Sequence, residues 1–178
     1  MPGATRIEDI DWERWTPTDR ATLVFVISHG QVLLIRKKRG LGAGKITGPG
    51  GGIEPGESPA DCARRELEEE LEVRPLGLEP CGANLVQFLD GQRLQFYVFR
   101  ASGCDGSPVE TVEAVPIWTP LDRIPYHETW EDDRLWLPLV INGTRFLGRF
   151  VFDGDAMLDQ HLEQGASATA VCREAMRP

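Results

Sequence analysis

A glycine-rich loop that runs directly into an acidic helix, at residues 50–73, constrains this chain more than any other segment. Ser58 is a suitable N-cap, and Pro59 sits in the first helical turn, where a missing N–H is tolerated. Asp61 completes a capping-box pattern, and nothing breaks the helix before about Leu71. The segment therefore predicts a helix over residues 59–71, preceded by a loop whose glycines let the backbone approach a ligand closely.

The apolar and acidic positions of this helix fall on neighbouring faces. At about 100° per residue, the apolar residues spaced four apart from Ala63 to Leu71 form one stripe that should face a core. Glu66 and Glu70 lie beside that stripe, and Glu69 lies one step further round. Partly desolvated carboxylates that repel one another favour a hard divalent cation such as Mg²⁺. The alternative is that these glutamates only form a solvated helix face.

Length, charge and cysteine spacing limit the possible classes of protein. The 178 residues suit one domain, and the formal net charge of −9 argues against a nucleic-acid partner. A run of eighteen apolar residues and a signal-peptide pattern are both missing, so we expect no membrane partner and a cytoplasmic protein. The cysteines are widely spaced, which predicts free thiols at Cys62, Cys81, Cys104 and Cys172.

Apolar and β-branched runs, separated by turn signals such as Asp90-Gly91, predict the strands of a mixed α/β fold. We expect these strands at residues 22–27, 32–35, 84–88, 94–99, 117–118, 145–152 and 156–162, with a surface loop at 103–108. The acidic helix should cover one face of a central mixed sheet. Residues 1–20 are predicted to be an N-terminal extension whose Trp12 and Trp15 pack on the domain, and residues 164–178 a loose tail.

The spacing from Gly51 to Val73 resembles the Nudix box, the signature of hydrolases that cleave nucleoside diphosphates linked to another moiety. Glu57 follows Gly51 after five residues, and after seven more comes the run from Arg65 to Glu70. The exception to the pattern is Glu72, where the family has glycine. Because that glycine usually forms a left-handed helix cap, we expect its loss to alter the end of the helix more than the chemistry.

Similarity continues over residues 22–162 to the MutT-type Nudix hydrolases of oxidised purine nucleotides, notably at 37–44, 108–113 and 130–138. The resemblance implies a Nudix fold over residues 21–163, a central mixed sheet sandwiched by helices. It implies hydrolysis of purine nucleoside triphosphates of the 8-oxo-dGTP or 2-hydroxy-dATP type to a monophosphate and pyrophosphate. The implied cofactor is Mg²⁺, with Mn²⁺ also possible. The implied partner is a small-molecule nucleotide, and we expect a monomer.

The resemblance also implies a role for each matching residue. Glu66, Glu69 and Glu70, with the backbone carbonyl of Gly50 and the more distant Glu113, match the metal site, and Glu69 or Glu70 would take the proton of the attacking water. Arg65 and Glu57 match the pair that orders the loop and the catalytic helix. The residues that match the nucleotide pocket are Thr22, Lys37, Thr47, Pro49, Gly50, Gly51, Gly52, Trp130, Asp132 and Asp133.

The pocket departs from the family at Ile46-Thr47, where the family has tryptophan and asparagine. Threonine offers only a hydroxyl where asparagine offers both a donor and an acceptor, so the base preference stays open. Asp132 and Asp133 can share a proton in a dry pocket and thereby contact more than one base edge; the alternative is two solvated acids.

Other functions remain open at this point. Other substrates would be a dinucleoside polyphosphate, a nucleotide sugar or ADP-ribose. A non-catalytic nucleotide-binding module would be expected to lack a metal carboxylate. An enzyme of capped nucleic-acid ends would be expected to carry a basic surface.

Overall fold

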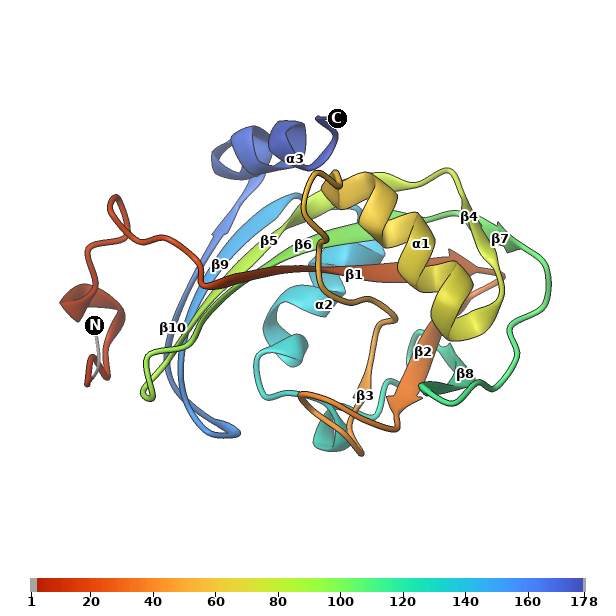
Figure 1. Ribbon diagram of the computed structural model, residues 1–178, viewed down its shortest axis with the longest axis horizontal. Coiled ribbons are helices and arrows are strands. Elements are labelled where there is room, and N and C mark those ends of the chain that lie inside the picture. Colours follow the sequence, from red (N-terminus) through yellow and green to blue (C-terminus); the bar gives the residue numbers. More distant parts are fainter. Residues whose placement is uncertain (1–2, 178) are drawn as a thin grey trace.

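A curved mixed β-sheet forms the centre of the computed structural model, which describes residues 3–177 (Figure 1). The strands run in the order β10-β9-β5-β6-β1-β2-β3, and β8 pairs with the free side of β2. Their bounds are β1 Asp19–Ser28, β2 Gln31–Lys37, β3 Ile46–Thr47, β5 Glu79–Phe88, β6 Arg93–Ala101, β8 Ala114–Pro120, β9 Phe146–Asp153 and β10 Ala156–Gln164. β1 is parallel to β6 and β5 is parallel to β9, whereas the other pairs are antiparallel. The predicted mixed sheet is confirmed.

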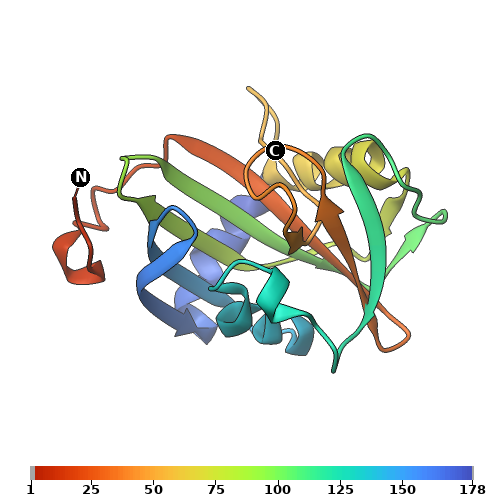
Figure 2. The same cartoon turned by 90° about the horizontal axis from the view of Figure 1, so that it is seen from below.

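Helices cover both faces of this sheet, as expected. α1 (Pro59–Leu71) and α3 (Thr169–Ala175) pack on the outer face, where they share an apolar cluster with Val24, Tyr97 and Phe99. α2 (Asp133–Asn142) lies inside the curve of the sheet (Figures 1 and 2). It packs there on a second cluster, which contains Phe25 and Phe146. The two faces of the sheet therefore belong to two separate cores, one around α1 and one around α2.

Local signals account for α1. The hydroxyl of Ser58 accepts a hydrogen bond from the N–H of Asp61 at 3.1 Å, as the capping pattern predicts. The stripe from Ala63 to Leu71 is fully buried. The helix ends at Glu72, which takes a left-handed conformation at φ 59° and ψ 32°. The helix thus keeps the cap geometry that favours glycine, with glutamate in its place.

The N-terminal extension packs on the domain, as predicted. Trp15 donates its indole N–H to the side chain of Gln87 on β5 at 3.1 Å, and the rings of Trp12 and Trp15 lie 5.6 Å apart. A short 3₁₀ helix, η1 (Ile7–Asp9), precedes them. The N–H of Ile7 donates to Asp159 of β10 at 2.8 Å. The proposed limits of the domain at residues 21 and 163 stay a prediction.

Two expectations about irregular segments are wrong. The predicted loose tail forms η3 (Gly165–Ala168) and α3, because Cys172 and Ala175 bury against the sheet and Tyr97 donates to Glu174 at 2.6 Å. The predicted surface loop at 103–108 begins with a short strand, β7 (Gly103–Asp105), which pairs with β4 (Arg74–Leu76). Both elements are held by contacts with distant residues, which the local sequence does not reveal.

The predicted free thiols are confirmed, since all four cysteines are unbonded. No helix within residues 3–177 is long and apolar enough to cross a bilayer.

Candidate active site

Arg65 joins the glycine-rich loop to the acidic helix. Its guanidinium donates to both carboxylate oxygens of Glu57 at 2.8 Å and to the carbonyl of Gly52 at 3.0 Å. The same group also donates to Glu66 at 2.7 Å and to Glu69 at 3.1 Å. These bonds lower the pKa of Glu57 and raise that of Arg65. The expected Arg65–Glu57 pair is therefore present, and it fixes the loop against α1.

Two of the candidate metal-binding glutamates are buried on α1 beside the loop. Glu66 is 8% exposed and Glu70 is 3% exposed, whereas Glu69 lies at the surface, in agreement with the helical phase. Burial raises the pKa of Glu66, and it raises that of Glu70 to about 7, although a bond from the Gly50 N–H opposes the shift. Such carboxyls favour a nearby cation, since a positive charge restores their ionised form.

The glycines of the loop let its backbone lie directly against Glu66 and Glu70. A Cβ atom at Gly51 would overlap with the carboxyl group of Glu66, and one at Gly50 would overlap with the carbonyl of Thr22. The N–H of Gly50 instead donates to Glu70 at 2.8 Å. The glycines at positions 50 and 51 are thus explained by contact of the loop with α1 on one side and with β1 on the other.

The four basic residues at the end of β2, residues 36–39, separate into two roles. Arg36, Lys38 and Arg39 are each paired with a carboxylate, the last with the candidate metal ligand Glu113. Lys37 has no such partner among the described residues, and it lines the central cavity. Lys37 is therefore the residue of this run that is available to a ligand in the cavity.

The donor set suits a divalent cation in chemistry. Glu66, Glu69, Glu70 and Glu113 offer only oxygen atoms, which Mg²⁺ and Mn²⁺ prefer. As the side chains stand within residues 3–177, no three acidic, histidine or cysteine groups form a ready metal cage. Arg65 forms ion pairs with Glu66 and Glu69, and Arg39 forms one with Glu113. A bound cation would have to replace these arginine contacts.

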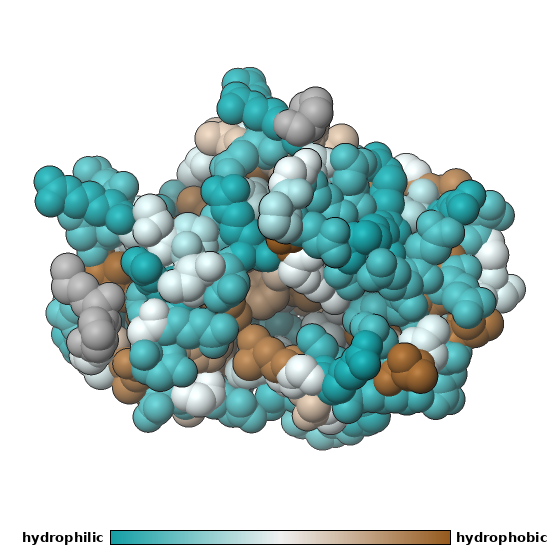
Figure 3. All heavy atoms as spheres, viewed as in Figure 1, coloured by the Kyte–Doolittle hydropathy of each residue, from teal (hydrophilic) through white to brown (hydrophobic). Residues whose placement is uncertain are grey.

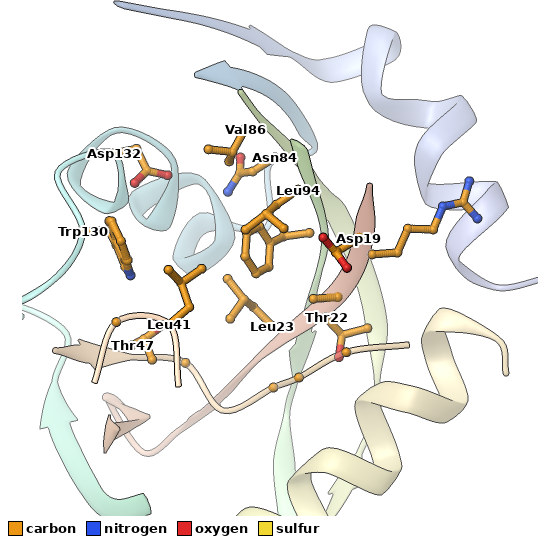
Figure 4. Close-up of a pocket in the computed structure, with 18 of the residues that line it drawn as sticks. Asp19, Thr22, Leu23, Leu41, Thr47, Asn84, Val86, Leu94, Trp130 and Asp132 are labelled. Atoms are coloured by element: carbon orange, nitrogen blue, oxygen red, sulfur yellow. The ribbon is translucent and has the colours of Figure 1, made fainter. Parts of the chain in front are cut away.

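A cavity of about 370 Å³ opens beside the glycine-rich loop, between the concave face of the sheet and the start of α2. Its mouth is visible as the central hollow in Figure 3, with apolar side chains near its border. Leu23, Val86, Leu94 and Phe96 line the sheet side. Trp130 and Asp132 line the opposite side (Figure 4). The volume falls in the range of small-molecule sites.

The aspartate pair at one end of the cavity is buried, which favours the pocket alternative over two solvated acids. Asp132 and Asp133 are only 6% and 5% exposed, and Asp132 accepts a hydrogen bond from the indole of Trp136 at 2.8 Å. Burial raises the pKa of Asp132 to about 6, against the effect of that bond. Burial and the charge of Asp132 raise the pKa of Asp133 well above its ordinary value. The pair therefore holds a proton more readily than exposed aspartates do.

Trp130 forms part of the wall next to this pair. Its ring meets Phe152 edge-on with centroids 5.8 Å apart, and the ammonium of Lys45 lies 4.9 Å from its centroid. A Cβ atom at Gly42 would lie 2.9 Å from its indole nitrogen, so the loop after β2 needs glycine to pass so close. The indole is thereby fixed in place from two sides.

The remaining predicted pocket residues divide into those that face the cavity and those that do not. Thr47, Gly50, Gly51 and Gly52 line it, whereas Pro49 is buried and its carbonyl accepts the Val24 N–H at 2.8 Å. Thr22 lies in the wall, but its hydroxyl is 3.4 Å from the sulfur of Cys62 on α1. The alternation of β1 turns its neighbour Leu23 into the cavity instead.

Sequence reasoning missed a polar residue of the pocket. Asn84 on β5 lines the cavity and is 2% exposed. The sequence marks it only as the first residue of a predicted strand, and an asparagine there gives no local signal of burial. Leu23 and Phe96 were missed as well, and only the alternation of their strands could have indicated their direction.

Known proteins resemble this chain in both sequence and fold. A family model of the NUDIX domain matches residues 17–140. The oxidized purine nucleoside triphosphate hydrolase of Danio rerio is 41% identical over 141 residues, which cover 79% of this chain and 90% of that protein. The Mus musculus protein of the same name is 39% identical over 145 residues, covering 80% and 93%. A crystal structure of a MutT protein from Bacillus halodurans matches in fold, with a TM-score of 0.72 at 24% identity, over 82% of this chain and 97% of that one. The box around α1, the match over most of the chain and the shared fold together establish that this protein belongs to the NUDIX family.

Proposed function

We propose that this protein hydrolyses oxidised purine nucleoside triphosphates to the monophosphate and pyrophosphate, with Mg²⁺ as its cofactor, and so removes damaged nucleotides. The proposal rests on one observation: the glycine-rich loop contacts both the cavity and the acidic helix. Gly50 and Gly51 line the base-sized cavity and also contact Glu70 and Glu66 of the acidic helix. A nucleotide with its base in the cavity would extend its phosphates past this loop towards the glutamates.

The base would lie between apolar walls and the aspartate pair. Leu23 and Leu94 on one side and Trp130 on the other offer apolar surface to a flat ring, while Asp132 and Asp133 offer its edge one acceptor and one protonated donor. The name shared by the Danio rerio and Mus musculus relatives, oxidized purine nucleoside triphosphate hydrolase, supports the same substrate class. A protonated carboxyl donates and an ionised one only accepts, so the pair can accommodate more than one modified purine.

At the phosphate end, the chain supplies both ligands and a base. A divalent ion held by Glu66, Glu69, Glu70, Glu113 and the Gly50 carbonyl would neutralise phosphate charge and lower the pKa of a bound water. Glu70, which a bound cation would keep ionised, is our candidate for the group that takes the proton of that water, and Glu69 is the alternative. Arg65 positions the helix relative to the loop, and Lys37 would contact the nucleotide.

The acidic surface favours a small-molecule substrate over a nucleic acid, since the net charge of −9 would repel a phosphate backbone. We further propose that the protein works as a monomer in the cytoplasm.

The test is pyrophosphate release with Mg²⁺ from 8-oxo-dGTP, 2-hydroxy-dATP, dGTP, dATP and ADP-ribose. We expect kcat/KM for a modified purine triphosphate to exceed that for its normal counterpart by about tenfold or more, since unmade hydrogen bonds discriminate strongly. Glu70→Gln is the inactive control. A preference for ADP-ribose would retain the box chemistry and refute the substrate class, and a lack of any hydrolysis would refute the enzyme.

Base binding is tested separately with Asp132→Ala. Removing the buried acceptor should weaken nucleotide binding about tenfold or more, measured by isothermal titration calorimetry with Ca²⁺ in place of Mg²⁺. Glu131→Ala, next in sequence but exposed, is the matched control. An unchanged affinity of the Asp132 variant would refute the role of the pair.

A further inference from the structure

Asn84 is a buried amide in an apolar wall, and its oxygen has no partner. The residue lies in β5 between Phe96 of β6 and Gly148 of β9, with 2% of its surface exposed. The amide oxygen accepts no hydrogen bond from any residue between 3 and 177. Its neighbours on the same side of the sheet, Val86 and Leu94, are apolar. A buried polar group in this condition is unfavourable unless something else supplies its bond.

The fold makes room for this amide. A Cβ atom at Gly148, directly across from Asn84, would lie 2.3 Å from the ring of Phe150 and 2.6 Å from the amide oxygen of Asn84. A residue with a side chain at position 148 would therefore displace both the ring and the amide. The sheet would pack as well with an apolar residue at position 84, so packing alone does not explain an asparagine there.

The amide faces the cavity of the proposed nucleotide site. Asn84 is among the cavity-lining residues, and in Figure 4 its amide points from the sheet towards the space bounded by Trp130, Leu41 and Leu23. Asp132 and Thr47 approach that space from other elements. A base in the cavity would thus meet Asn84 on one side and the aspartate pair on another.

We propose that Asn84 is a specificity-determining residue that recognises the imidazole edge of an 8-oxopurine; this inference rests on the proposed function. Oxidation at C8 gives this edge a C8=O acceptor and an N7–H donor side by side. An amide presents one N–H₂ donor and one C=O acceptor at the same spacing, and rotation by 180° exchanges them. Asn84 would make both bonds with the oxidised base. A normal purine, with N7 as acceptor and no polar group at C8, would leave the amide oxygen unpaired.

This arrangement complements the missing family asparagine. Thr47 offers only a hydroxyl to the base, and its side chain is partly buried in the wall next to Ile46. Asn84 supplies an amide from the opposite side of the cavity. In this chain the amide would therefore come from β5, whereas the family pattern has it at the position of Thr47 in β3.

The experiment compares wild type with Asn84→Leu, which keeps the approximate size and removes both polar atoms. Three substrates are used: 8-oxo-dGTP, dGTP, and 2-hydroxy-dATP, which is modified at C2 but has an ordinary imidazole edge. We expect kcat/KM for 8-oxo-dGTP to fall about 10- to 100-fold, with values for dGTP and 2-hydroxy-dATP changed less than about threefold. Loss of an unpaired amide should leave the melting temperature equal or higher.

Gln95→Leu is the matched control. It removes a buried amide from the opposite face of the same sheet and should leave the ratio between substrates unchanged. Asn84→Ser gives a second variant with a polar but shorter side chain, which should lose the 8-oxo preference in the same direction.

An equal loss on all three substrates, or no loss on 8-oxo-dGTP, overturns the role of Asn84 while the proposed function stands. If wild type itself hydrolyses none of these triphosphates, the proposed function fails, and the inference about Asn84 fails with it.

Discussion

Glu72 ends the catalytic helix in a backbone conformation that glycine adopts at lower cost, and the effect of Glu72→Gly follows from this geometry. At φ 59° and ψ 32°, a residue with a Cβ atom is strained by about 1–2 kcal/mol. Glycine removes that strain but loses about 0.5–1 kcal/mol more chain entropy on folding. The exposed carboxylate at the negative end of the helix dipole adds an unfavourable interaction of about 0.3–1 kcal/mol.

The sum predicts that Glu72→Gly raises the free energy of unfolding by about 1 kcal/mol, or the melting temperature by about 2–4 °C for a chain of this size. Urea denaturation with an unchanged m-value would measure it. Glu72→Ala removes the charge but keeps the Cβ atom, so it should recover only the charge contribution. Glu72→Asn should fall between glycine and alanine, because asparagine tolerates this region. The reasoning is refuted if the alanine variant is as stable as the glycine variant, or if glycine destabilises the protein.

Three further predictions concern the site. Gly51→Ala should reduce kcat by at least about 100-fold with the fold retained by circular dichroism, because the new methyl group would overlap with the carboxyl of Glu66; near wild-type activity would contradict it. The raised pKa values of Glu66, Glu70 and the aspartate pair let the folded protein hold protons that the unfolded chain has lost, so these groups lower the free energy of unfolding as pH rises from about 4 through 7. Changing Asp132 and Asp133 to asparagine should make that slope smaller in denaturant titrations, and an unchanged slope would exclude the pair as a source of it. Trp136→Phe removes the indole donor that stabilises ionised Asp132, so the apparent pKa in the pH profile of nucleotide affinity should rise by about 1–2 units; a fall would be incompatible with that bond.

Elements with strong local signals could be predicted from the sequence, and those held by distant contacts could not. α1 has a capping serine, a proline in its first turn and a clear apolar stripe, so its limits follow from residues 58–71 alone. α2 contains Pro138, which lacks an N–H, and its N-cap side chain makes no capping bond. This helix is held by tertiary packing instead, through Trp136 and Val140 against the concave face.

The same distinction applies to the site. Arg65, Glu57 and the glutamates of α1 lie within one local segment, so their spacing fixes their geometry. The burial of Asn84 depends instead on the pairing of β5 with β9, more than sixty residues later in the chain. Thr22 is a second example, because a one-residue step along β1 decides whether a side chain contacts the cavity or α1, and the apolar run of the sequence does not fix that step.

The division of the site between two faces of one sheet explains how substrate choice can change while the chemistry stays the same. The glutamates belong to the outer core around α1, and the aspartate pair belongs to the inner side around α2. The loop at residues 48–52 lies between them, and a Cβ atom at Gly48 would lie 2.7 Å from the ring of Phe25, so the loop packs closely on the core. We therefore expect a substitution at Thr47 or Asn84 to alter contacts with a bound base without moving Glu66 or Glu70. On this proposal the carboxylates of the box are retained while the polar groups that contact the base differ, so the chemistry and the substrate preference can change independently.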